Sequence, residues 1–400
     1  MQWVYLDNNA TTRPAPQVLD AIAEAHDQLW ANPSSVHRFG QAVRQRLELA
    51  RASVAKLIAA KPREIIFTSG GTEANNLALW GVLDRDDDTP PALITTTIEH
   101  SAVREPGEAM AQTGIVVEQV AVGRTGVVDA TAVIDAARQH VDAGRVVLVS
   151  VQWANNETGT IQPVAAIGEG LQALRSGRRN AVTFHIDATQ AVGKLPVDVH
   201  AVGADLLTLA AHKFHGPKGV GALYARRGVR LRPQQRGGPQ EGERRGGTEN
   251  TVGVIGMGVA ADLARAFVAD AEQVAALTAL RDRFERELLA AVPGAVVNAG
   301  EPGVSRLWNT SNIAFPGLEA EAILLGLSEK GVCASAGAAC SSGSLDPSPV
   351  LLAMGVPEPL AHGSVRFSIS RATTAQEIDA AVQAVPEVVR RLGRTLPTGV

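Results

Sequence analysis

Residues 205–219 read Asp205-Leu206-Leu207-Thr208-Leu209-Ala210-Ala211-His212-Lys213-Phe214-His215-Gly216-Pro217-Lys218-Gly219. The first five have the pattern of a short buried strand, and Lys213 follows them among small residues, histidine and glycine. A lysine held in a half-buried site has a lowered pKa and can serve as an amine nucleophile or Schiff-base partner. A lysine after a strand is more often a solvated surface residue, so this interpretation needs support from the rest of the chain.

The surrounding chain, from about residue 60 to 225, alternates short β-branched runs with helical patterns. Expected strands are 65–67, 92–95, 115–120, 145–151, 182–186 and 205–209, and expected helices include 72–83, 101–112 and 164–174. This alternation predicts an α/β fold whose mostly parallel sheet is covered on both faces. Such sheets bind ligands at the carboxyl ends of their strands.

The second half of the chain predicts a smaller α+β domain. Residues 236–248, rich in glycine and arginine, indicate an ordered loop or boundary, and a long linking helix is expected over 252–289, with a possible kink near Gly256 and Gly258. Further strands are expected at 295–297, 309–315 and 365–369, with helices at 319–330 and 374–392. We therefore expect a large domain over 15–260 and a small domain made of 1–14 and 261–400.

Composition narrows the class of protein. The 400 residues are 45% hydrophobic, which supports a real core and excludes disorder as the main state. The formal charge of -4 gives no large positive field, which argues against nucleic acid as a partner. We expect no membrane span, because no apolar run approaches the roughly 18 residues needed, and no signal peptide, because residues 1–7 lack a basic region and an apolar signal core. A soluble cytoplasmic protein, with no membrane partner, is expected.

The stretch Thr68-Ser69-Gly70-Gly71-Thr72-Glu73 follows one expected strand and opens a helix. The free backbone N–H groups of a first helical turn bind anions, and the two glycines let a phosphate approach closely. Thr72 could be both the helix cap and a hydroxyl donor. No Gly-Lys-Ser/Thr follows, so this is not a P-loop. An ordinary capped turn remains the alternative.

Asp187 ends another apolar strand, in Thr183-Phe184-His185-Ile186-Asp187. An aspartate there can pair with a protonated ring nitrogen, or it can simply cap a helix from Ala188 onward. Together, Lys213, Asp187 and the glycine-rich turn supply an amine, a carboxylate and a phosphate cradle at strand ends. These are the three anchors that pyridoxal phosphate needs.

Other patterns are weaker. His212 and His215 have a spacing that could serve a metal, but no further ligand motif accompanies them, so no metal site is expected. Of the two cysteines, Cys340 lies in a run of small residues with little to bury, which favours a reactive thiol on a mobile loop. Cys333 is expected to pack as a small hydrophobic residue.

These residues together resemble the cysteine desulfurases, class-V aminotransferase-like enzymes. The resemblance runs in order from residue 5 to about 390 and is carried by Tyr5-Leu6-Asp7-Asn8-Asn9-Ala10-Thr11-Thr12, Asn32-Pro33-Ser34-Ser35, Thr68 to Asn76, Glu99-His100, Asn155-Asn156-Glu157, Asp187-Ala188-Thr189-Gln190, His212-Lys213 and Gly246-Gly247-Thr248-Glu249-Asn250. The loop Cys340-Ser341-Ser342-Gly343-Ser344-Leu345-Asp346-Pro347 looks most like the nitrogen-fixation branch.

The resemblance implies a fold and a cofactor. The fold would be the type I fold of pyridoxal-phosphate-dependent transferases, with a seven-stranded, mostly parallel sheet in the large domain. The enzyme would be a homodimer that takes sulfur from L-cysteine, releases L-alanine, and passes the sulfur to an iron–sulfur scaffold protein.

The resemblance also implies a role for each site residue. Lys213 would carry the cofactor, Asp187 would hold its ring nitrogen protonated, and Gln190 would bond its phenolic oxygen. His100 would stack on the ring and relay protons, and we expect it to be the base that activates Cys340, which would carry the persulfide. Phosphate binding would fall to Gly71, Thr72, His212 and Thr248, the last from the partner subunit because the loop around Gly246 shows no anchor of its own. Asn156 would line the cofactor and substrate pocket, and Arg366 would bind the carboxylate of the substrate.

One position departs from the family pattern. The family often has a serine phosphate donor three residues before the lysine, where this chain has Ala210. Losing a charge-assisted donor costs on the order of 1.5–3 kcal/mol of binding unless another group substitutes. Alternative functions on the same fold are a selenocysteine lyase or an aminotransferase, for which the Cys340 loop would be incidental, and a non-enzymatic scaffold would need Lys213, Asp187 and His100 to be structural.

Overall fold

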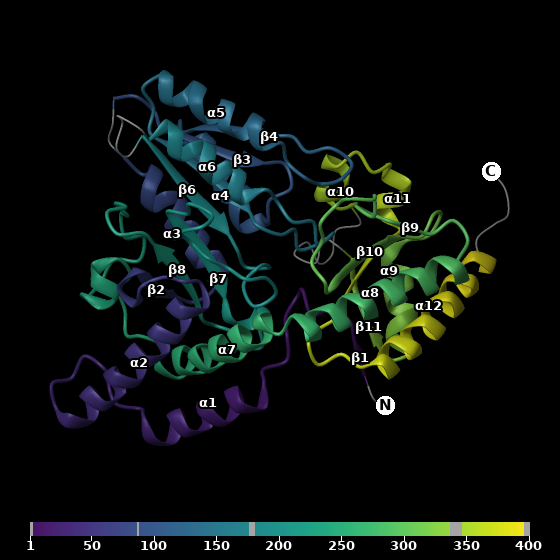
Figure 1. The fold of residues 1–400 in the computed structure, drawn as a ribbon, viewed down its shortest axis with the longest axis horizontal. Helices are drawn as coiled ribbons and strands as arrows, with labels where there is room; N and C mark the ends of the chain where they lie inside the picture. The colour runs from purple at the N-terminus through teal and green to yellow at the C-terminus, as the bar shows by residue number, and fades with distance from the viewer. Residues whose placement is uncertain (1–2, 86–87, 176–180, 337–345, 396–400) are drawn as a thin grey trace.

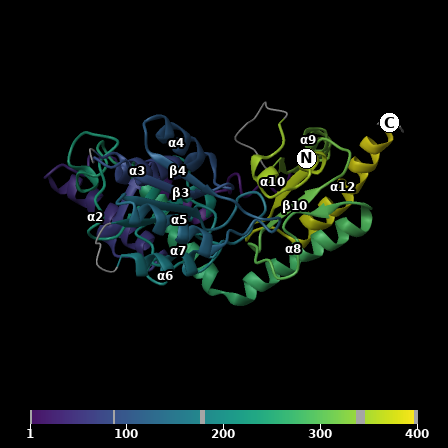
Figure 2. The same ribbon diagram turned by 90° about the horizontal axis from the view of Figure 1, so that it is seen from above.

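The computed structural model describes residues 3–85, 88–175, 181–336 and 346–395. Two groups of elements lie beside each other (Figures 1 and 2). Helices α1 to α7 surround the larger sheet, and helices α8 to α12 lie with the smaller strands. The chain passes from one group to the other between α7 and α8.

The larger group is built on a seven-stranded sheet. Its order is β2 (Ile65–Thr68), β8 (Gly221–Ala225), β7 (Leu206–Ala210), β6 (Val182–Asp187), β5 (Val147–Gln152), β3 (Ala92–Thr96) and β4 (Val116–Val120). Strand β8 is antiparallel to both of its neighbours, and the other pairs, from β7 to β4, are parallel. The predicted seven-stranded, mostly parallel sheet is confirmed.

Helices cover both faces of this sheet because successive strand residues point to opposite sides. On β2, Ile65 and Phe67 pack in one apolar cluster with α2, α5, α6 and α7, whereas Ile66 packs in another with α3 and α4. The helices are α1 (Pro16–Gln28), α2 (Arg38–Leu57), α3 (Gly71–Leu83), α4 (Ser101–Gln112), α5 (Ala130–Asp142), α6 (Val164–Leu174) and α7 (Thr251–Ala269). Short 3-10 turns are η1 (Pro62–Glu64), η2 (Ala211–Lys213) and η3 (Gln240–Glu243).

The long linking helix is two helices, α7 and α8 (Ala271–Ala291). They separate at Asp270, whose side chain accepts a hydrogen bond from the Gln273 N–H at 3.0 Å and so caps α8. Gly256 and Gly258 both lie inside α7, so the break between the two helices falls at Asp270 and not near these glycines. They allow close packing instead, as the small size of glycine permits.

Helix α7 also corrects the expectation about apolar runs. Within the described residues it is long and apolar enough to cross a membrane, judged by length and composition alone. It packs against α1 and α2, and more than half of its apolar window is buried inside the protein. A buried core helix passes the same test of length and composition.

The smaller group holds a four-stranded antiparallel sheet and a separate two-stranded ladder. The sheet has the order β12 (Ser335–Ala336), β13 (Ser364–Ser368), β10 (Thr310–Ala314) and β9 (Val296–Val297), and β1 (Val4–Tyr5) pairs with β11 (Val332–Cys333). Helices α8, α9 (Ala320–Glu329) and α12 (Ala375–Thr395) supply its apolar cluster, while α10 (Pro349–Ala353) and α11 (Glu358–His362) contribute to another. The domain limits at residues 14 and 260 stay a prediction.

Packing of α7 on α2 should be sensitive to one methyl group. A Cβ at Gly258 would lie 2.7 Å from the Cα of Ala50, which is backbone and cannot swing aside. We expect Gly258→Ala to lower the free energy of unfolding by about 1–3 kcal/mol through overpacking. Urea unfolding followed by circular dichroism measures it.

Gly393 in α12 is the matched control, because a Cβ there would meet no atom within 4 Å. Gly393→Ala should be neutral or stabilising by roughly 0.5–1 kcal/mol, as alanine favours a helix interior. Equal effects of the two substitutions would contradict the packing account.

Candidate active site

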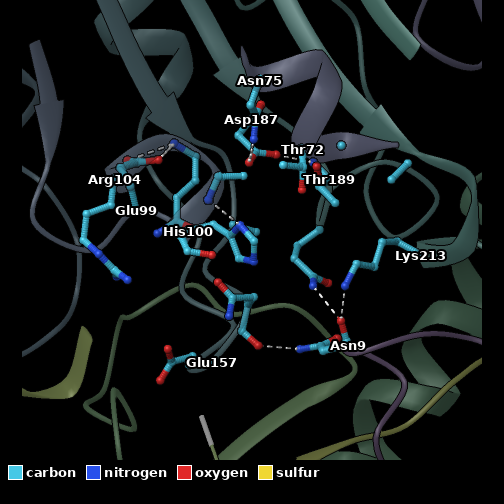
Figure 3. Close-up of a pocket in the computed structure, with 18 of the residues that line it drawn as sticks. Asn9, Thr72, Asn75, Glu99, His100, Arg104, Glu157, Asp187, Thr189 and Lys213 are labelled. Carbon is cyan, nitrogen blue, oxygen red and sulfur yellow. Dashed lines mark hydrogen bonds between the residues drawn. The ribbon is translucent and has the colours of Figure 1, made fainter. Parts of the chain in front are cut away.

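A cavity of about 710 Å³ lies where β5, β6 and β7 end and α3 and α4 begin (Figure 3). Nine of the predicted site residues line it: Gly71, Thr72, His100, Asn156, Asp187, Gln190, His212, Lys213 and Arg366. Parallel strands bring their carboxyl ends to one edge of the sheet, which is why residues far apart in the sequence meet here. Arg366 is the member contributed by the smaller group, from β13.

Lys213 ends η2, directly after β7. Its Nζ donates hydrogen bonds to the carbonyl oxygens of Asn9 at 2.6 Å and Ala10 at 2.9 Å. These acceptors are neutral backbone groups, and the side chain lies within the cavity rather than on an outer surface. The alternative of a solvated surface lysine is therefore wrong.

Asp187 is buried at the end of β6. Its Oδ2 accepts from Asn75 Nδ2 at 2.8 Å, and its Oδ1 accepts from the Thr189 N–H at 2.9 Å (Figure 3). The second bond caps a turn, so the capping alternative is partly right, but a turn and not a helix follows. Two hydrogen bonds hold the carboxylate toward the cavity without neutralising it with a cation.

The first turn of α3 is open toward the cavity. The helix begins at Gly71 with Gly70 as its N-cap and no side-chain cap, so the prediction that Thr72 caps the helix was wrong. A Cβ at Gly71 would lie 3.2 Å from Thr189 Oγ1 and 3.6 Å from the Cβ of Ala210. Glycine therefore keeps space in front of the free N–H groups of this turn.

The Thr189 hydroxyl lies beside this space. Its Oγ1 is buried and has no hydrogen-bond partner among the described residues. A buried hydroxyl left unpaired costs free energy, so a polar ligand at this end of the cavity would satisfy it. It can supply the donor that Ala210 lacks.

His100 is the N-cap of α4. Its Nδ1 accepts from the Ala102 N–H at 3.1 Å, and because a backbone N–H can only donate, the neutral ring carries its proton on Nε2. The ring therefore lines the cavity as a donor. The role of His100 as the base that activates Cys340 stays a prediction, because Cys340 lies outside the described residues.

His212 is held in its neutral form. Burial, followed by the nearby charge of Lys213, lowers the pKa of His212 to about 4. Its Nδ1 lies 3.2 Å from Thr11 Oγ1, whereas the ring of His215 bonds the carbonyl of Arg13. The two histidines thus have separate partners.

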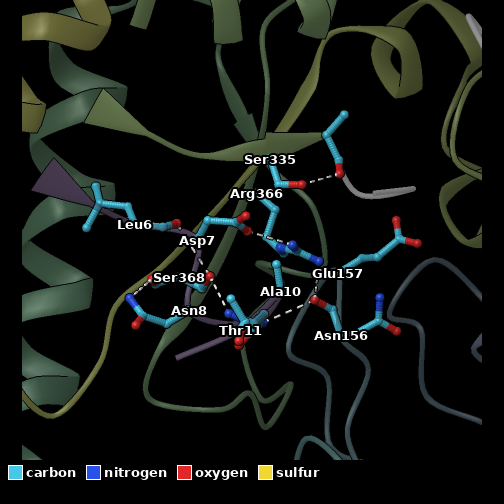
Figure 4. Close-up of polar contacts among 12 residues, drawn as sticks. Leu6, Asp7, Asn8, Ala10, Thr11, Asn156, Glu157, Ser335, Arg366 and Ser368 are labelled. Carbon is cyan, nitrogen blue, oxygen red and sulfur yellow. Dashed lines mark hydrogen bonds and ion pairs between the residues drawn. The ribbon is translucent and has the colours of Figure 1, made fainter. Parts of the chain in front are cut away.

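Arg366 is the largest fully buried side chain of the described residues that lines the cavity. One guanidinium nitrogen bonds Asp7 Oδ1 at 2.8 Å and another bonds the carbonyl of Asn156 at 3.1 Å (Figure 4). Its Nε has no partner among the described residues. The guanidinium therefore keeps donor capacity for an anionic ligand.

Two buried carboxyl groups of the cavity were not assigned from the sequence, although Glu99 and Glu157 each stand next to a predicted site residue. Glu99 accepts from the Thr96 hydroxyl at 2.6 Å and from the Gln152 N–H. Glu157 accepts from the Ser348 hydroxyl at 2.6 Å. Burial is the largest influence on both and raises their pKa values, that of Glu99 to about 8.

Thr248 lies in a second groove, with Trp30, Pro33 and Lys218, and not among the residues that line the cavity. The reason given for its partner role was wrong, because the loop has an anchor in its own chain. Arg245 bonds both carboxylate oxygens of Glu73, at 2.9 and 3.4 Å. Cys340 lies outside the described residues.

The comparison with known proteins decides the family. The model of the class-V aminotransferases matches residues 4–381. This chain belongs to the class-V aminotransferase family. A cysteine desulfurase of Trichormus variabilis is 46% identical over 397 residues, which cover 99% of this chain and 96% of that relative.

Solved structures of the family give the same fold. A NifS-like protein matches with a TM-score of 0.87 and 33% identity, covering 98% of this chain and 100% of its own. The structure of SspA in complex with cysteine matches with a TM-score of 0.77 and 31% identity, covering 92% and 99%. The resemblance to cysteine desulfurases and the predicted fold class are confirmed.

The buried carboxyl of Glu99 should make the stability of the protein depend on pH. Its pKa is about 8 in the fold and roughly 4.3 in an unfolded chain, so the fold binds the proton more tightly. The resulting stability is complete below the unfolded value and is lost as pH rises through about 8. We expect Glu99→Gln, which stays neutral, to gain stability relative to the parent protein between about pH 5 and 8.

Urea unfolding at a series of pH values measures this difference. Glu108→Gln, at an exposed position of α4, the helix that follows Glu99 in the chain, is the control and should differ from the parent by a constant amount. A flat difference for Glu99→Gln across the range would mean that the carboxyl is already ionised in the fold.

Proposed function

We propose that this chain is a pyridoxal-phosphate-dependent cysteine desulfurase that removes sulfur from L-cysteine and releases L-alanine. One observation carries the proposal: a single cavity holds the amine of Lys213, the carboxylate of Asp187 and the open first turn of α3, with Arg366 at its other side. An amine, a carboxylate and an anion cradle match the three chemical parts of the cofactor. A guanidinium beside them suits an amino-acid carboxylate.

The residues present fit the cofactor. Lys213 would hold it covalently through its amine, and Asp187 would keep its ring nitrogen protonated. The N–H groups at Gly71 and Thr72 would bind its phosphate with His212, and the unpaired Thr189 hydroxyl would take the place of the donor missing at Ala210. When bound, the cofactor supplies an electron sink for bond cleavage in the substrate.

The chain's own groups then orient the substrate. Arg366 would bind the substrate carboxylate through its buried guanidinium, whose position Asp7 and the Asn156 carbonyl fix. Neutral His100 would hold or deliver the proton on its Nε2. The side chain of Arg366 is buried, so its contact with a carboxylate is stronger than it would be in water.

Sulfur would leave the substrate by attack of the Cys340 thiolate. A sulfur–sulfur bond forms while the carbon–sulfur bond breaks, the electron pair stays with the substrate carbon, and a proton completes alanine. Cys333 is the poorer nucleophile because burial raises the pKa of its thiol and Asp7 adds to that shift. It is also fixed in β11, paired with Tyr5 of β1.

The same proposal includes the assembly of the enzyme and the protein that accepts its sulfur. We infer a cytoplasmic homodimer in which Thr248 of one subunit completes the phosphate site of the other, since its own cavity does not include it. The sulfur acceptor would be an iron–sulfur scaffold protein. The Cys340 loop and the relatives named cysteine desulfurases support a desulfurase over an aminotransferase or a selenocysteine lyase.

The proposal is tested at the two cysteines. Cys340→Ser should bind the cofactor with its visible absorbance intact but lose production of alanine and sulfide from L-cysteine. Cys333→Ser is the matched control and should stay close to the parent activity. Alanine formation, and mass spectrometry of the persulfide, provide the measurements.

A persulfide mapped to Cys333, or normal turnover by Cys340→Ser, would overturn this mechanism. Lys213→Ala checks the cofactor assignment in the same assays, because it should lose both turnover and the visible absorbance. If that variant kept the absorbance after reduction and dialysis, another lysine would hold the cofactor.

Sharing of the site between subunits predicts complementation. Lys213→Ala and Thr248→Val chains should each be impaired alone, since one lacks the amine and the other lacks a phosphate donor. In a mixed dimer, the Lys213 of one chain meets the Thr248 of the other, so one intact site is regenerated. Co-expression with two different tags isolates the mixed dimer, and its activity at limiting cofactor should exceed that of either parent variant.

A mixed dimer no more active than the Thr248→Val dimer would show that Thr248 acts within its own chain. A monomer that retained full activity would contradict the shared site as well.

A further inference from the structure

Lys194 is a buried lysine for which the mechanism has given no role. It lies beside the cavity with 5% of its surface exposed. Its Nζ donates to Gln190 Oε1 and, at 3.3 Å, to Asn9 Oδ1. A buried amine costs free energy unless it is well paired, so its position calls for a reason.

The conformation of the backbone holds Lys194 close to Gln190. Gly193 has a positive φ of 78°, and a Cβ there would lie 2.5 Å from the Cβ of Phe214. The Trp308 indole donates to the carbonyl of Lys194 at 3.0 Å. The turn between Gln190 and Lys194 is therefore fixed at both its glycine and its end.

Two neighbours determine which way the Gln190 amide faces. The ammonium or amine of Lys194 donates to Oε1, and the carbonyl of Asn9 accepts from Nε2 at 3.0 Å. A flipped amide would set Nε2 against Nζ and Oε1 against a carbonyl oxygen, losing both bonds. The donor beside one end of the amide and the acceptor beside the other end therefore allow one orientation.

The orientation has a consequence for the cavity. An amide nitrogen has two hydrogens, and the described residues account for one hydrogen bond from Gln190 Nε2. Gln190 lines the cavity, so its second N–H is left for an acceptor there. Such a donor stabilises an oxygen that carries negative charge more than a neutral one.

Asn9 anchors the same network from the other side. Its Oδ1 accepts from Asn309 Nδ2 at 2.9 Å as well as from Lys194, and its Nδ2 donates to Thr310 Oγ1 at 2.9 Å. Its carbonyl also receives Lys213 Nζ. Lys194 therefore braces the residue against which the amine of Lys213 rests.

We propose that Lys194 is a positioning residue, which fixes the Gln190 amide with Nε2 toward the cavity so that the phenolic oxygen of the cofactor meets a donor. The inference rests on the proposed function, in which Gln190 bonds that oxygen. Lys194 itself need not touch the cofactor. The burial of Lys194, with Lys213 and Arg366 nearby, lowers its pKa, and a neutral amine still donates both of its hydrogen bonds.

The experiment is a double-mutant cycle on the holoenzyme, read by the pH titration of the visible band of the bound cofactor. A donor to the phenolic oxygen favours its ionised form, so Lys194→Met should raise the titration midpoint by about one pH unit, a tenfold change in the ionisation constant. Gln190→Ala should give a similar rise. Adding Lys194→Met to Gln190→Ala should change nothing further, because the lysine acts through the amide.

The cycle separates orientation from charge. If Lys194 acted only by its charge on the cofactor or on Lys213, its substitution would shift the midpoint equally in both backgrounds, and the proposal would be overturned. A midpoint unchanged in Gln190→Ala would overturn it too, since the amide would then not serve the oxygen. A parent protein without any visible cofactor band would instead be a failure of the proposed function.

Two further variants guard against loss of the fold. Lys56→Met, at an exposed position of α2, is the matched control and should leave the midpoint unchanged. Lys194→Gln keeps a donor near the same place and should hold the midpoint closer to the parent value if Lys194→Met does not fold. A midpoint displaced fully in Lys194→Gln, with the cofactor dissociation constant unchanged, would contradict the orienting role.

Discussion

The cavity depends on the hydrogen bonds that hold Asn9 between the two groups of elements. The side chain is 1% exposed, and its amide bonds Thr310 and Asn309 of the smaller group, Lys194 of the larger group and the Asn156 carbonyl. Its backbone N–H bonds Ser368 Oγ at 2.9 Å. A buried amide this fully paired stabilises one arrangement only, because any shift between the groups would leave several donors and acceptors unpaired.

This junction explains why the site mixes residues from both ends of the chain. The segment around Asp7 crosses from β1 to the mouth of the larger sheet, where it meets Arg366 of β13. Burial, and after it the charges of nearby cationic groups such as Lys213, lower the pKa values of Lys194 beside the cavity and of His212 within it. An anion placed among them would relieve that repulsion and raise both pKa values, so binding of a phosphorylated ligand is coupled to their protonation.

Strands and helices that depend on a local sequence pattern could be predicted from the sequence. The strand that ends in Asp187 and the strand before Lys213 appear where periodicity placed them, because a strand buried on both faces needs a continuous apolar run. Strand β8 was missed, since its residues Gly221-Ala222-Leu223-Tyr224-Ala225 include no β-branched side chain. The separation of α7 from α8 depends on one capping bond of Asp270, which apolar periodicity does not register.

The supporting residues of the site could not be predicted in the same way. Lys194 and Asn9 are 185 positions apart in the sequence, and their roles depend on the hydrogen bond between them. No spacing in the sequence predicts such a pair. Glu99 differs, because it stands next to His100, shortly after the expected strand 92–95, and could have been predicted as a residue of the site. The capping role of His100 was equally hidden, although it determines which ring nitrogen carries the proton.

The surroundings of Cys333 argue against this thiol as the sulfur carrier of the proposed reaction. Cys333 pairs with Tyr5 in a parallel ladder, and its thiol is half-buried with a raised pKa. A sulfur carrier must reach a substrate in the cavity and then an acceptor outside it, which a residue fixed in a ladder cannot do. Cys340 lies in a sequence of alanines, glycines and serines with few apolar side chains, which is why we propose it, and not Cys333, as the sulfur carrier.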